Sequence, residues 1–459
     1  MDIIIPSTVM DIINILENNK FEAYVVGGCV RDSILGRTPN DWDITTDALP
    51  EKVMEIFKEI GATVVPTGIK HGTVTVIIDN DSYEITTYRI DGEYKDSRRP
   101  EEVIFTSKLQ EDLARRDFTI NAMAYNPKKG LKDYFNGSDD LKNKIIKTVG
   151  NPIDRFNEDA LRMLRAIRFS AQLTFDIEKD TIEAIEKLSG NIKNISIERI
   201  REEFNKIILS DNPKAIYDLY NYGLLENFMP EFKLAINTKQ NNPHHIYTVG
   251  EHIIKSMENI DKELILRLTM FLHDIGKPKT ITTDDNGIDH FHNHPLVSKD
   301  MAEVILKRMK YDNNTIDKVL TLVQYHDQRI STKKSIRRLL SKIGEENFKD
   351  LIKVWKADVK AQNPDLLPKK LENISNVDMK FQEILEKNQC FSLKDLAISG
   401  KDLINLGIKP GKEIGEILNK LLEEVIENPE MNDRDKLIKR VQIRAQVYIS
   451  TQLSVHSDG

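Results

Sequence analysis

A short apolar run, a Gly-Gly pair and an Asp-x-Asp triplet follow one another near the N-terminus, and together they strongly restrict the possible folds. The run at 24–26 predicts a strand that ends at Gly27-Gly28. A helix with Arg31 and Asp32 in its first turn is expected to follow. Because two glycines allow a phosphate to approach the backbone and a helix N-terminus favours an anion, this strand–turn–helix unit can hold a phosphate group.

The Asp-x-Asp triplet predicts a metal-dependent site. Asp41 and Asp43 flank Trp42 at the start of a second predicted strand, where the two-residue period places both carboxylates on one face. Two carboxylates on one face can hold a pair of Mg²⁺ ions, which activate a hydroxyl nucleophile and stabilise a leaving phosphate oxygen. Glu84, on a nearby predicted strand, is a candidate third catalytic carboxylate or, alternatively, a surface strand residue.

Secondary-structure signals divide the chain into an α/β part and a helical part. Short runs rich in Val, Ile, Thr and Tyr predict strands at 23–28, 42–46, 62–68, 72–79, 83–90 and 102–107. From about residue 155 the pattern is helical almost to the end. We therefore expect an α+β head followed by a long all-helical body.

The composition indicates a globular protein of the cytoplasm. No apolar run approaches the roughly 18 residues that a membrane span needs, so no membrane partner is expected. The N-terminus lacks the basic segment of a signal peptide. Because Cys29 and Cys390 are the only cysteines, a disulfide framework is excluded and a reducing compartment is predicted. The net charge of −7 means that any RNA binding must use local basic surfaces.

A charged stripe on the predicted helix at 157–173 fits the recognition of a nucleobase. On a helical wheel Glu158, Asp159, Arg162 and Arg165 share one face, with Arg168 at its border, while apolar residues fill the other face. Cytosine and adenine each present an amino donor beside a ring-nitrogen acceptor, which a carboxylate and a guanidinium can read together. Guanine and uracil reverse this order. The alternative is an ordinary amphipathic helix with i,i+4 ion pairs.

Taken in order, these motifs resemble the class II tRNA nucleotidyltransferase and bacterial poly(A) polymerase branch of the polymerase-beta-type nucleotidyltransferases. After the segment at 24–50, the matching stretches lie at 89–105, 111–126, 133–141, 151–169 and 195–209. The resemblance implies a polymerase-beta-type α+β head, then an all-helical neck, a metal-binding domain and a body or tail. The expected domains are a catalytic head at 1–150, a neck at 151–235, a metal-binding domain at 240–332 and a body or tail at 333–459.

The resemblance also implies roles for individual residues. Asp159 and Arg162 would read the base, and Asp41 and Asp43 would hold Mg²⁺. Contacts to the triphosphate or base are implied for Gly28, Arg31, Arg116, Arg165 and Arg168. Clustered arginines such as Arg115 and Arg116 suit phosphate on chemical grounds as well.

The function implied is addition of CCA to the 3′ end of tRNA from CTP and ATP, by a monomer or homodimer. An A-adding enzyme or a poly(A) polymerase is the neighbouring alternative. The segment at 89–100 is predicted to form a mobile loop with hinges at Gly92 and Ser97, and its Arg98 and Arg99 could reach the nucleotide. A loop of this length argues against a CC-only enzyme, because that loop is shortened in CC-only members of the family.

Eight of the ten histidines lie between His244 and His326, which predicts a second metal site. His273-Asp274, followed by Ile-Gly, resembles an HD-type phosphohydrolase module. The ligands that this resemblance implies are His252, His273, Asp274, His294 and His326, although the sequence does not separate His290 and His292 from His294. Imidazole and carboxylate ligands suit Mn, Ni, Co or Zn. The possibilities are a metal-dependent phosphohydrolase, as an accessory activity or as the main one, and a helical domain with only a structural role.

The C-terminal part gives weaker signals. Gly407 is predicted to follow the end of one helix, and Pro410 to start the next. The basic segment at 333–342 could contact tRNA or form a solvated face.

Overall fold

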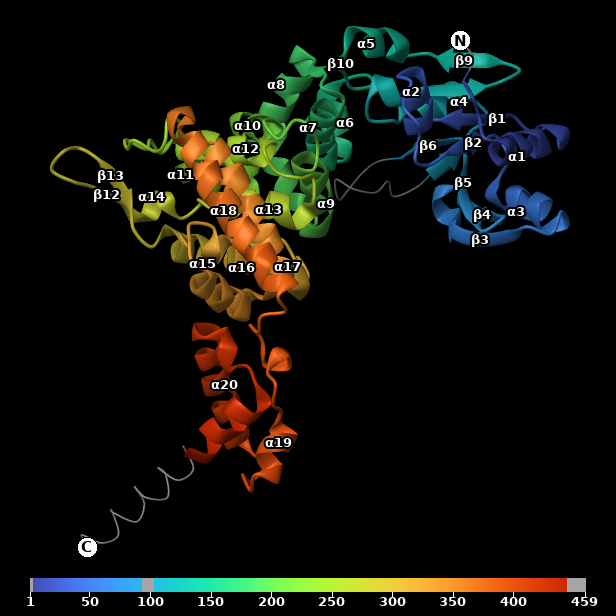
Figure 1. Cartoon of the computed structure of the whole chain (residues 1–459). Helices are drawn as coiled ribbons and strands as arrows, with labels where there is room; N and C mark the ends of the chain where they lie inside the picture. Colours follow the sequence, from blue (N-terminus) through green and yellow to red (C-terminus); the bar gives the residue numbers. More distant parts are fainter. Residues whose placement is uncertain (1–2, 93–102, 444–459) are drawn as a thin grey trace, which may run out of the picture. The chain divides into compact units, whose positions relative to one another are not determined.

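The computed structural model describes residues 3–92 and 103–443 and divides the chain into two compact units (Figure 1). The first unit is formed by residues 1–233 and 308–310, and the second by 234–307 and 311–459. Ser97, Arg98 and Arg99 of the predicted mobile loop lie outside the described residues.

A mixed seven-stranded sheet forms the head of the first unit. Its strand order is β3-β4-β5-β2-β1-β8-β9, in which β2 and β5 are parallel and the other neighbours antiparallel. The strands are β1 (Ala23–Val26), β2 (Ile44–Thr46), β3 (Thr63–Gly68), β4 (Thr73–Ile78), β5 (Asp81–Thr87), β8 (Met123–Asn126) and β9 (Gly130–Asp133). The head helices are α1 (Ser7–Asn18), α2 (Gly28–Ile34), α3 (Pro50–Glu59), α4 (Leu109–Ala114) and α5 (Gly137–Asn143). The α+β head expected from the sequence is therefore present.

Two details of the strands differ from the sequence prediction. The run at 83–90 ends its first strand at Thr87, and β6 (Arg89–Asp91) then pairs with β7 (Val103–Phe105) in a separate two-stranded sheet. Strand β8, next to the edge strand β9, was not predicted, because its sequence Met-Ala-Tyr-Asn lacks the β-branched residues that mark strands. All four of its residues are buried beside β1, so tertiary packing and not local propensity makes it a strand.

The neck of the first unit is helical but contains a break that the helical wheel does not reveal. Its helices are α6 (Pro152–Glu158), α7 (Leu161–Leu173), α8 (Lys179–Leu188), α9 (Ile197–Ile208) and α10 (Ala215–Asn221). Asp159 has the extended dihedrals φ −141° and ψ 105° between α6 and α7. The prediction of one helix through 157–173 was therefore wrong, and Asp159 lies outside both helices, although Arg162 still pairs with Glu158 across the break.

The second unit is a helical assembly with one small hairpin. It contains α11 (Phe232–Asn237), α12 (Val249–Glu258), α13 (Leu264–Leu272), α14 (Lys277–Thr280), α15 (His294–Arg308), α16 (Asn313–Tyr325), α17 (Lys333–Lys360), α18 (Leu367–Glu386), α19 (Gly400–Asn405) and α20 (Lys412–Glu427). The hairpin of β12 (Ile281–Thr283) and β13 (Asp289–Phe291) interrupts the helical pattern that the sequence predicted throughout this region. Among residues 3–92 and 103–443, every helix is either too short or too polar to span a bilayer.

Two predictions for the C-terminal part can be compared with the structure. Gly407 follows α19 with a φ of +91°, as expected for a residue just past a helix end. The next helix begins at Lys412 and not at Pro410, with Gly411 as its N-cap. In the basic segment at 333–342, Arg337 is buried and donates to the carbonyl of Ile426 at the end of α20, while Lys334 and Arg338 pair with Glu427. These cations are thus engaged within the unit.

Substitution of Arg337 should destabilise this packing more than substitution of its neighbour. Arg337→Met removes charge-assisted hydrogen bonds to the Ile426 carbonyl at 2.8 and 3.0 Å, and should lower the free energy of unfolding by about 2–3 kcal/mol. Arg338→Met removes an exposed ion pair that contributes about 0–1 kcal/mol. Hydrogen exchange of the α20 amides in each variant measures the difference, and equal protection in both would contradict this role of Arg337.

Candidate functional site

The Gly-Gly turn of the head lies directly against two arginines. Gly27 has a φ of +83°, and a Cβ at this position would lie 2.7 Å from Nη1 of Arg116. At Gly28 the nearest atom to such a Cβ is Nη2 of Arg31, at 3.7 Å. Two guanidinium groups are therefore gathered at the turn where the sequence predicted phosphate binding. Nε of Arg116 is buried and has no hydrogen-bond partner among residues 3–92 and 103–443.

The predicted carboxylates lie at the same edge of the sheet. Ile44 of β2 pairs with Ile85 of β5 in parallel register, so the preceding residues, Asp43 and Glu84, are neighbours. Asp43 is exposed at the surface, yet surrounding atoms partly desolvate it. This desolvation raises the pKa of Asp43, Arg116 opposes the increase, and the negative charges of Asp41 and Glu84 add to it. Asp41 and Glu84 are thus close enough to Asp43 for their charges to affect it. Within the described part of the chain, however, the three residues do not form a cluster of ligand atoms within 4.8 Å.

The arginines of α7 meet those of the head around one aromatic ring. The guanidinium carbons of Arg31, Arg165 and Arg168 lie 5.0, 5.4 and 4.1 Å from the ring centroid of Phe169. A ring face attracts cations, so Phe169 lets like charges converge at lower cost. Burial and the neighbouring charge of Arg165 lower the pKa of Arg168 to about 10. Cations gathered in this way suit a polyanionic ligand such as a triphosphate.

Asp117, which the sequence analysis did not single out, holds this cluster in place. Its carboxylate accepts hydrogen bonds from Arg165 at 2.7 Å, from the side chain of Asn121 at 3.2 Å and from the backbone of Phe118 at 2.9 Å. Asn121 in turn accepts from Arg31 at 2.7 Å. Burial would raise the pKa of Asp117, but Arg165 and Arg162 lower it to about 2.

The two residues predicted to read the base have separate partners. Asp159 pairs with Arg199 of α9, with Nη2 2.8 Å from Oδ2, and its Oδ1 accepts from the amide of Leu161 at 3.0 Å. Arg162 donates to Glu158 at 2.6 Å and to the carbonyl of Arg115 at 3.1 Å. Asp159 and Arg162 are close in the fold, but their role in base selection stays a prediction. Arg199 was not identified from sequence, because its partner is 40 residues away.

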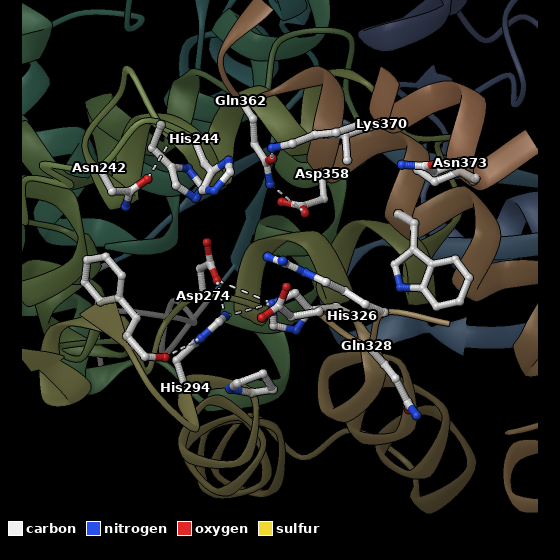
Figure 2. A pocket seen from close by; sticks show the side chains of 18 of the residues that line it. Asn242, His244, Asp274, His294, His326, Gln328, Asp358, Gln362, Lys370 and Asn373 are labelled. Carbon is white, nitrogen blue, oxygen red and sulfur yellow. Dashed lines mark hydrogen bonds and ion pairs between the residues drawn. The ribbon is translucent and has the colours of Figure 1, made fainter. Parts of the chain in front are cut away.

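In the second unit the five predicted metal ligands come together from four helices or their ends. Figure 2 shows three of them, Asp274, His294 and His326, at the wall of a pocket. His252 lies on α12, His273 and Asp274 follow α13, His294 begins α15 and His326 follows α16. The Nε2 atoms of His252 and His273 are 3.1 Å apart, and those of His294 and His326 are 3.2 Å apart. Two overlapping groups of ligand atoms are compact enough to hold a metal ion: His252, His273 and Asp358; and His273, Asp274 and His326.

Backbone carbonyls orient all four histidine rings. Nδ1 of His252, His273, His294 and His326 lies 2.7–3.0 Å from the carbonyls of Ala361, Met270, Phe291 and Val323, respectively. Because a carbonyl only accepts hydrogen bonds, each Nδ1 must carry the proton. In a neutral ring this leaves a lone pair on Nε2, directed into the cluster, which is the arrangement that metal-binding histidines use.

Two carboxylates complete the cluster. Asp274 directs Oδ2 to His252 and His273, both at 3.3 Å, and Oδ1 to His294 and His326 at 3.3 and 3.5 Å. Burial would raise its pKa, but His273 and Lys277 hold the pKa of Asp274 well below its usual value.

Asp358 was missed from the sequence. Its Oδ1 lies 2.8 Å from Nε2 of His252. The available signal was a carboxylate on the buried face of an amphipathic helix, since Val354, Trp355 and Ala361 flank it at helical spacing.

The cluster opens into a cavity of about 940 Å³. Cationic side chains line it at Lys277, Arg329, Lys370 and Lys380. His290 and His292 also line the cavity, but they stack on each other, with ring centroids 5.5 Å apart, and His290 pairs with Asp284. The structure thus separates them from His294, which the sequence could not do.

Comparisons with known proteins agree with the fold of the first unit. The family model described as "Poly A polymerase head domain" matches residues 23–147, and "Probable RNA and SrmB- binding site of polymerase A" matches residues 174–236. A model of tRNA nucleotidyltransferase domain 2 matches residues 281–441. The fold and site therefore define a nucleotidyltransferase head joined to a helical RNA-binding part.

Relatives along almost the whole chain narrow this class further. The CCA-adding enzyme of Lactobacillus helveticus is 35% identical over 94% of this chain and 95% of its own length, and that of Ligilactobacillus salivarius is 36% identical over 91% and 92%. The crystal structure of the Bacillus stearothermophilus CCA-adding enzyme with CTP superposes with a TM-score of 0.71 at 27% identity, covering 95% of this chain and 98% of that one. The chain belongs to the CCA-adding enzyme family of tRNA nucleotidyltransferases.

Gly27→Ala should impair nucleotide transfer by displacing Arg116. The added methyl group would meet Nη1 at 2.7 Å, and a misplacement of about 1 Å in an active site can reduce activity about 100-fold. Gly36→Ala is the matched control, because Gly36 also has a positive φ, +69°, but no described atom lies within 4 Å of the place that its added methyl group would take. Steady-state nucleotide incorporation by both variants tests this, and similar losses would point to backbone strain alone.

Proposed function

We propose that this enzyme adds CCA to the 3′ end of tRNA, using CTP and ATP, and that it does so without a nucleic acid template. The observation that carries the proposal is the convergence of the Gly27-Gly28 turn, the acidic edge of the sheet and the arginines around Phe169 in one unit. The relatives named for CCA addition, and a structure of one of them with CTP, support it. Cysteine usage also favours a cytoplasmic location.

The residues of the head divide the work of nucleotidyl transfer. Arg31, Arg116, Arg165 and Arg168 bind and neutralise the triphosphate, because guanidinium groups pair with phosphate oxygens in fixed geometry. Asp41 and Asp43 supply hard oxygen ligands at an edge of accumulated negative charge, so they fit Mg²⁺, with Glu84 as the third catalytic carboxylate. Bound there, Mg²⁺ would activate the 3′ hydroxyl of tRNA and stabilise the leaving pyrophosphate.

Selection of C and A follows from the polarity of Asp159 and Arg162. A carboxylate accepts the amino proton of cytosine or adenine, and a guanidinium donates to the adjacent ring nitrogen. Guanine and uracil place a carbonyl opposite the carboxylate and an N–H opposite the guanidinium, and each unpaired buried group costs about 1–3 kcal/mol. This pairing logic favours CTP and ATP equally, so it does not separate CCA addition from A addition or from poly(A) synthesis.

The order of incorporation tests the proposal. The purified protein should add two C residues to a tRNA lacking its last three nucleotides when given CTP alone, and should complete CCA when ATP is added. Absence of C incorporation, together with efficient ATP addition to a tRNA ending in CC, would establish an A-adding enzyme instead. Continued A addition beyond the third nucleotide would indicate a poly(A) polymerase.

In the same assay, Asp41→Ala and Asp43→Ala should abolish incorporation while tRNA binding is retained. Asp81→Ala, at the start of β5, removes an equal charge and should leave transfer unchanged. More than about one per cent of wild-type activity in either active-site variant would contradict the two-metal assignment, since the metals lower the barrier by several kcal/mol.

A second proposal concerns the histidine cluster of the second unit, which we infer binds a divalent transition metal. Two pairs of Nε2 atoms, each pair about 3.1–3.2 Å apart, direct lone pairs at each other because every Nδ1 is already bonded to a carbonyl. Such facing lone pairs repel unless a cation lies between them. Oδ1 of Asp274 has no hydrogen-bond donor among residues 3–92 and 103–443, while Lys277 pairs with Oδ2 at 2.7 Å, so a lone pair remains on Oδ1 for a metal ion. The imidazole and carboxylate set suits Mn, Ni, Co or Zn.

Hydrolysis of a phosphate ester is the activity that this cluster would support. A metal bound there would supply a water molecule activated for attack on phosphorus. The cationic residues Lys277, Arg329 and Lys370 on the cavity wall would bind the anionic substrate. The alternative is a metal-binding or purely structural domain with no hydrolytic activity.

Metal analysis tests the cluster independently of hydrolysis. The wild-type protein should retain bound Mn, Ni, Co or Zn after dialysis and should melt at a higher temperature than the metal-free form. His273→Ala combined with Asp274→Ala should lose that metal and any phosphatase or phosphodiesterase activity on nitrophenyl phosphate esters, while nucleotide addition is largely kept. His290→Ala, which lies outside the cluster, is the control and should retain metal. A wild-type protein that holds no transition metal would overturn this proposal.

A further inference from the structure

We propose that Arg199 is a positioning residue for nucleotide selection, which acts by fixing the carboxylate of Asp159. The inference rests on the proposed function, in which Asp159 accepts the amino proton of cytosine or adenine. Arg199 engages both oxygens of that carboxylate, with Nη2 2.8 Å from Oδ2 and Nη1 3.4 Å from Oδ1. A fork that engages both oxygens defines the plane of a carboxylate as well as its position.

Apart from Arg199, few contacts hold the side chain of Asp159. Its backbone has extended dihedrals between α6 and α7 and is bonded on both sides, from its amide to the carbonyl of Arg155 at 3.4 Å and from the amide of Arg162 to its carbonyl at 3.0 Å, but these bonds do not fix the direction of the carboxylate. The amide of Leu161 donates to Oδ1 at 3.0 Å, which fixes one oxygen only. Without Arg199 the carboxylate would be held by one hydrogen bond only and could rotate. The oxygen that accepts the amino proton of the base would then no longer point in a fixed direction.

The helix that carries Arg199 is itself anchored to the arginine cluster. Glu203 lies one turn after Arg199 on α9, on the same helical face, and pairs with Arg168 with Nε 3.2 Å from Oε2. The pair between Arg199 and Asp159 is largely shielded from solvent, since the Asp159 side chain is 15% exposed and that of Arg199 25%. Helix α9 therefore holds two residues of the nucleotide site at a fixed distance from each other: Arg168 through Glu203, and Asp159 through Arg199.

An ion pair with Arg199 does not prevent Asp159 from binding a base. A carboxylate has about four lone-pair directions, of which residues 3–92 and 103–443 use three, through Nη2 and Nη1 of Arg199 and the amide of Leu161. One direction remains for an amino proton. The same arrangement excludes a donor role, because an ion-paired carboxylate only accepts hydrogen bonds, and so it disfavours the carbonyl that uracil or guanine would present.

The test compares discrimination among variants of Arg199. Arg199→Met should reduce the ratio of kcat/KM for CTP to that for UTP by about tenfold, which corresponds to the loss of one charge-assisted hydrogen bond of about 1.4 kcal/mol. Arg199→Lys keeps the charge and one donor, and should restore part of the ratio. Arg201→Met is the matched control, because it removes the same charge from α9 but its guanidinium donates to the carbonyl of Lys310.

A double-variant cycle separates positioning from a structural role. If Arg199 acts through Asp159, adding Arg199→Met to Asp159→Ala should change discrimination no further, whereas independent effects would multiply. Equal slowing of CTP, ATP, UTP and GTP in Arg199→Met, with the ratio unchanged, would overturn the inference, as would multiplicative effects in the cycle. Circular dichroism and melting temperature identify a variant that fails to fold, and Arg199→Lys then carries the comparison. Failure of the wild type to incorporate CTP or ATP would refute the proposed function itself, which this ratio does not test.

Discussion

The ion pair between the buried carboxylate of Asp117 and the partly exposed guanidinium of Arg165 is the interaction on which the nucleotide site depends. Asp117 belongs to the head and Arg165 to helix α7, so this contact fixes the register of two elements far apart in sequence. Asn121, which also donates to Asp117, orients Arg31. Loss of one member of a buried pair leaves an uncompensated charge and typically costs about 3–5 kcal/mol. The positions of Arg165 and Arg31 beside Phe169 therefore depend on a single carboxylate, whereas Glu203 holds Arg168.

The sequence predicted elements well wherever local propensity and burial agree. The strands that follow Asp43 and Gly61 are rich in β-branched residues, and they form as expected. Strand β8 has none, and only its place between β1 and β9 makes it a strand. The helix break at Asp159 was not predicted from the sequence, because the apolar pattern continues across it. An aspartate whose carboxylate accepts from the amide two residues later can begin a helix as readily as it can lie within one.

The residues of the candidate sites likewise fall into those that the sequence predicted and those that it did not. Residues recognisable by type and spacing, such as the Gly-Gly turn, the Asp-x-Asp triplet and the clustered histidines, lie together in the structure. Asp358, Asp117 and Arg199 were missed because each reaches the site from another element, through a contact distant in sequence. Burial identifies such residues once the fold is known. A single sequence gives only a weak hint, such as a carboxylate on the apolar face of α17.

The hydrogen bonds that orient the histidine rings determine how well the cluster tolerates sequence divergence. In three of the four, Nδ1 bonds to the carbonyl three residues earlier, so ring orientation is specified within four consecutive residues. Substitutions elsewhere in the chain can shift such a helix end as a whole without changing the orientation of the histidine ring relative to that helix end. His252 is the exception, because its brace is Ala361, beyond the end of α17. Among related sequences, a substitution near residue 361 should therefore disturb the orientation of a cluster histidine more than a similar substitution in the loops between the other ligands.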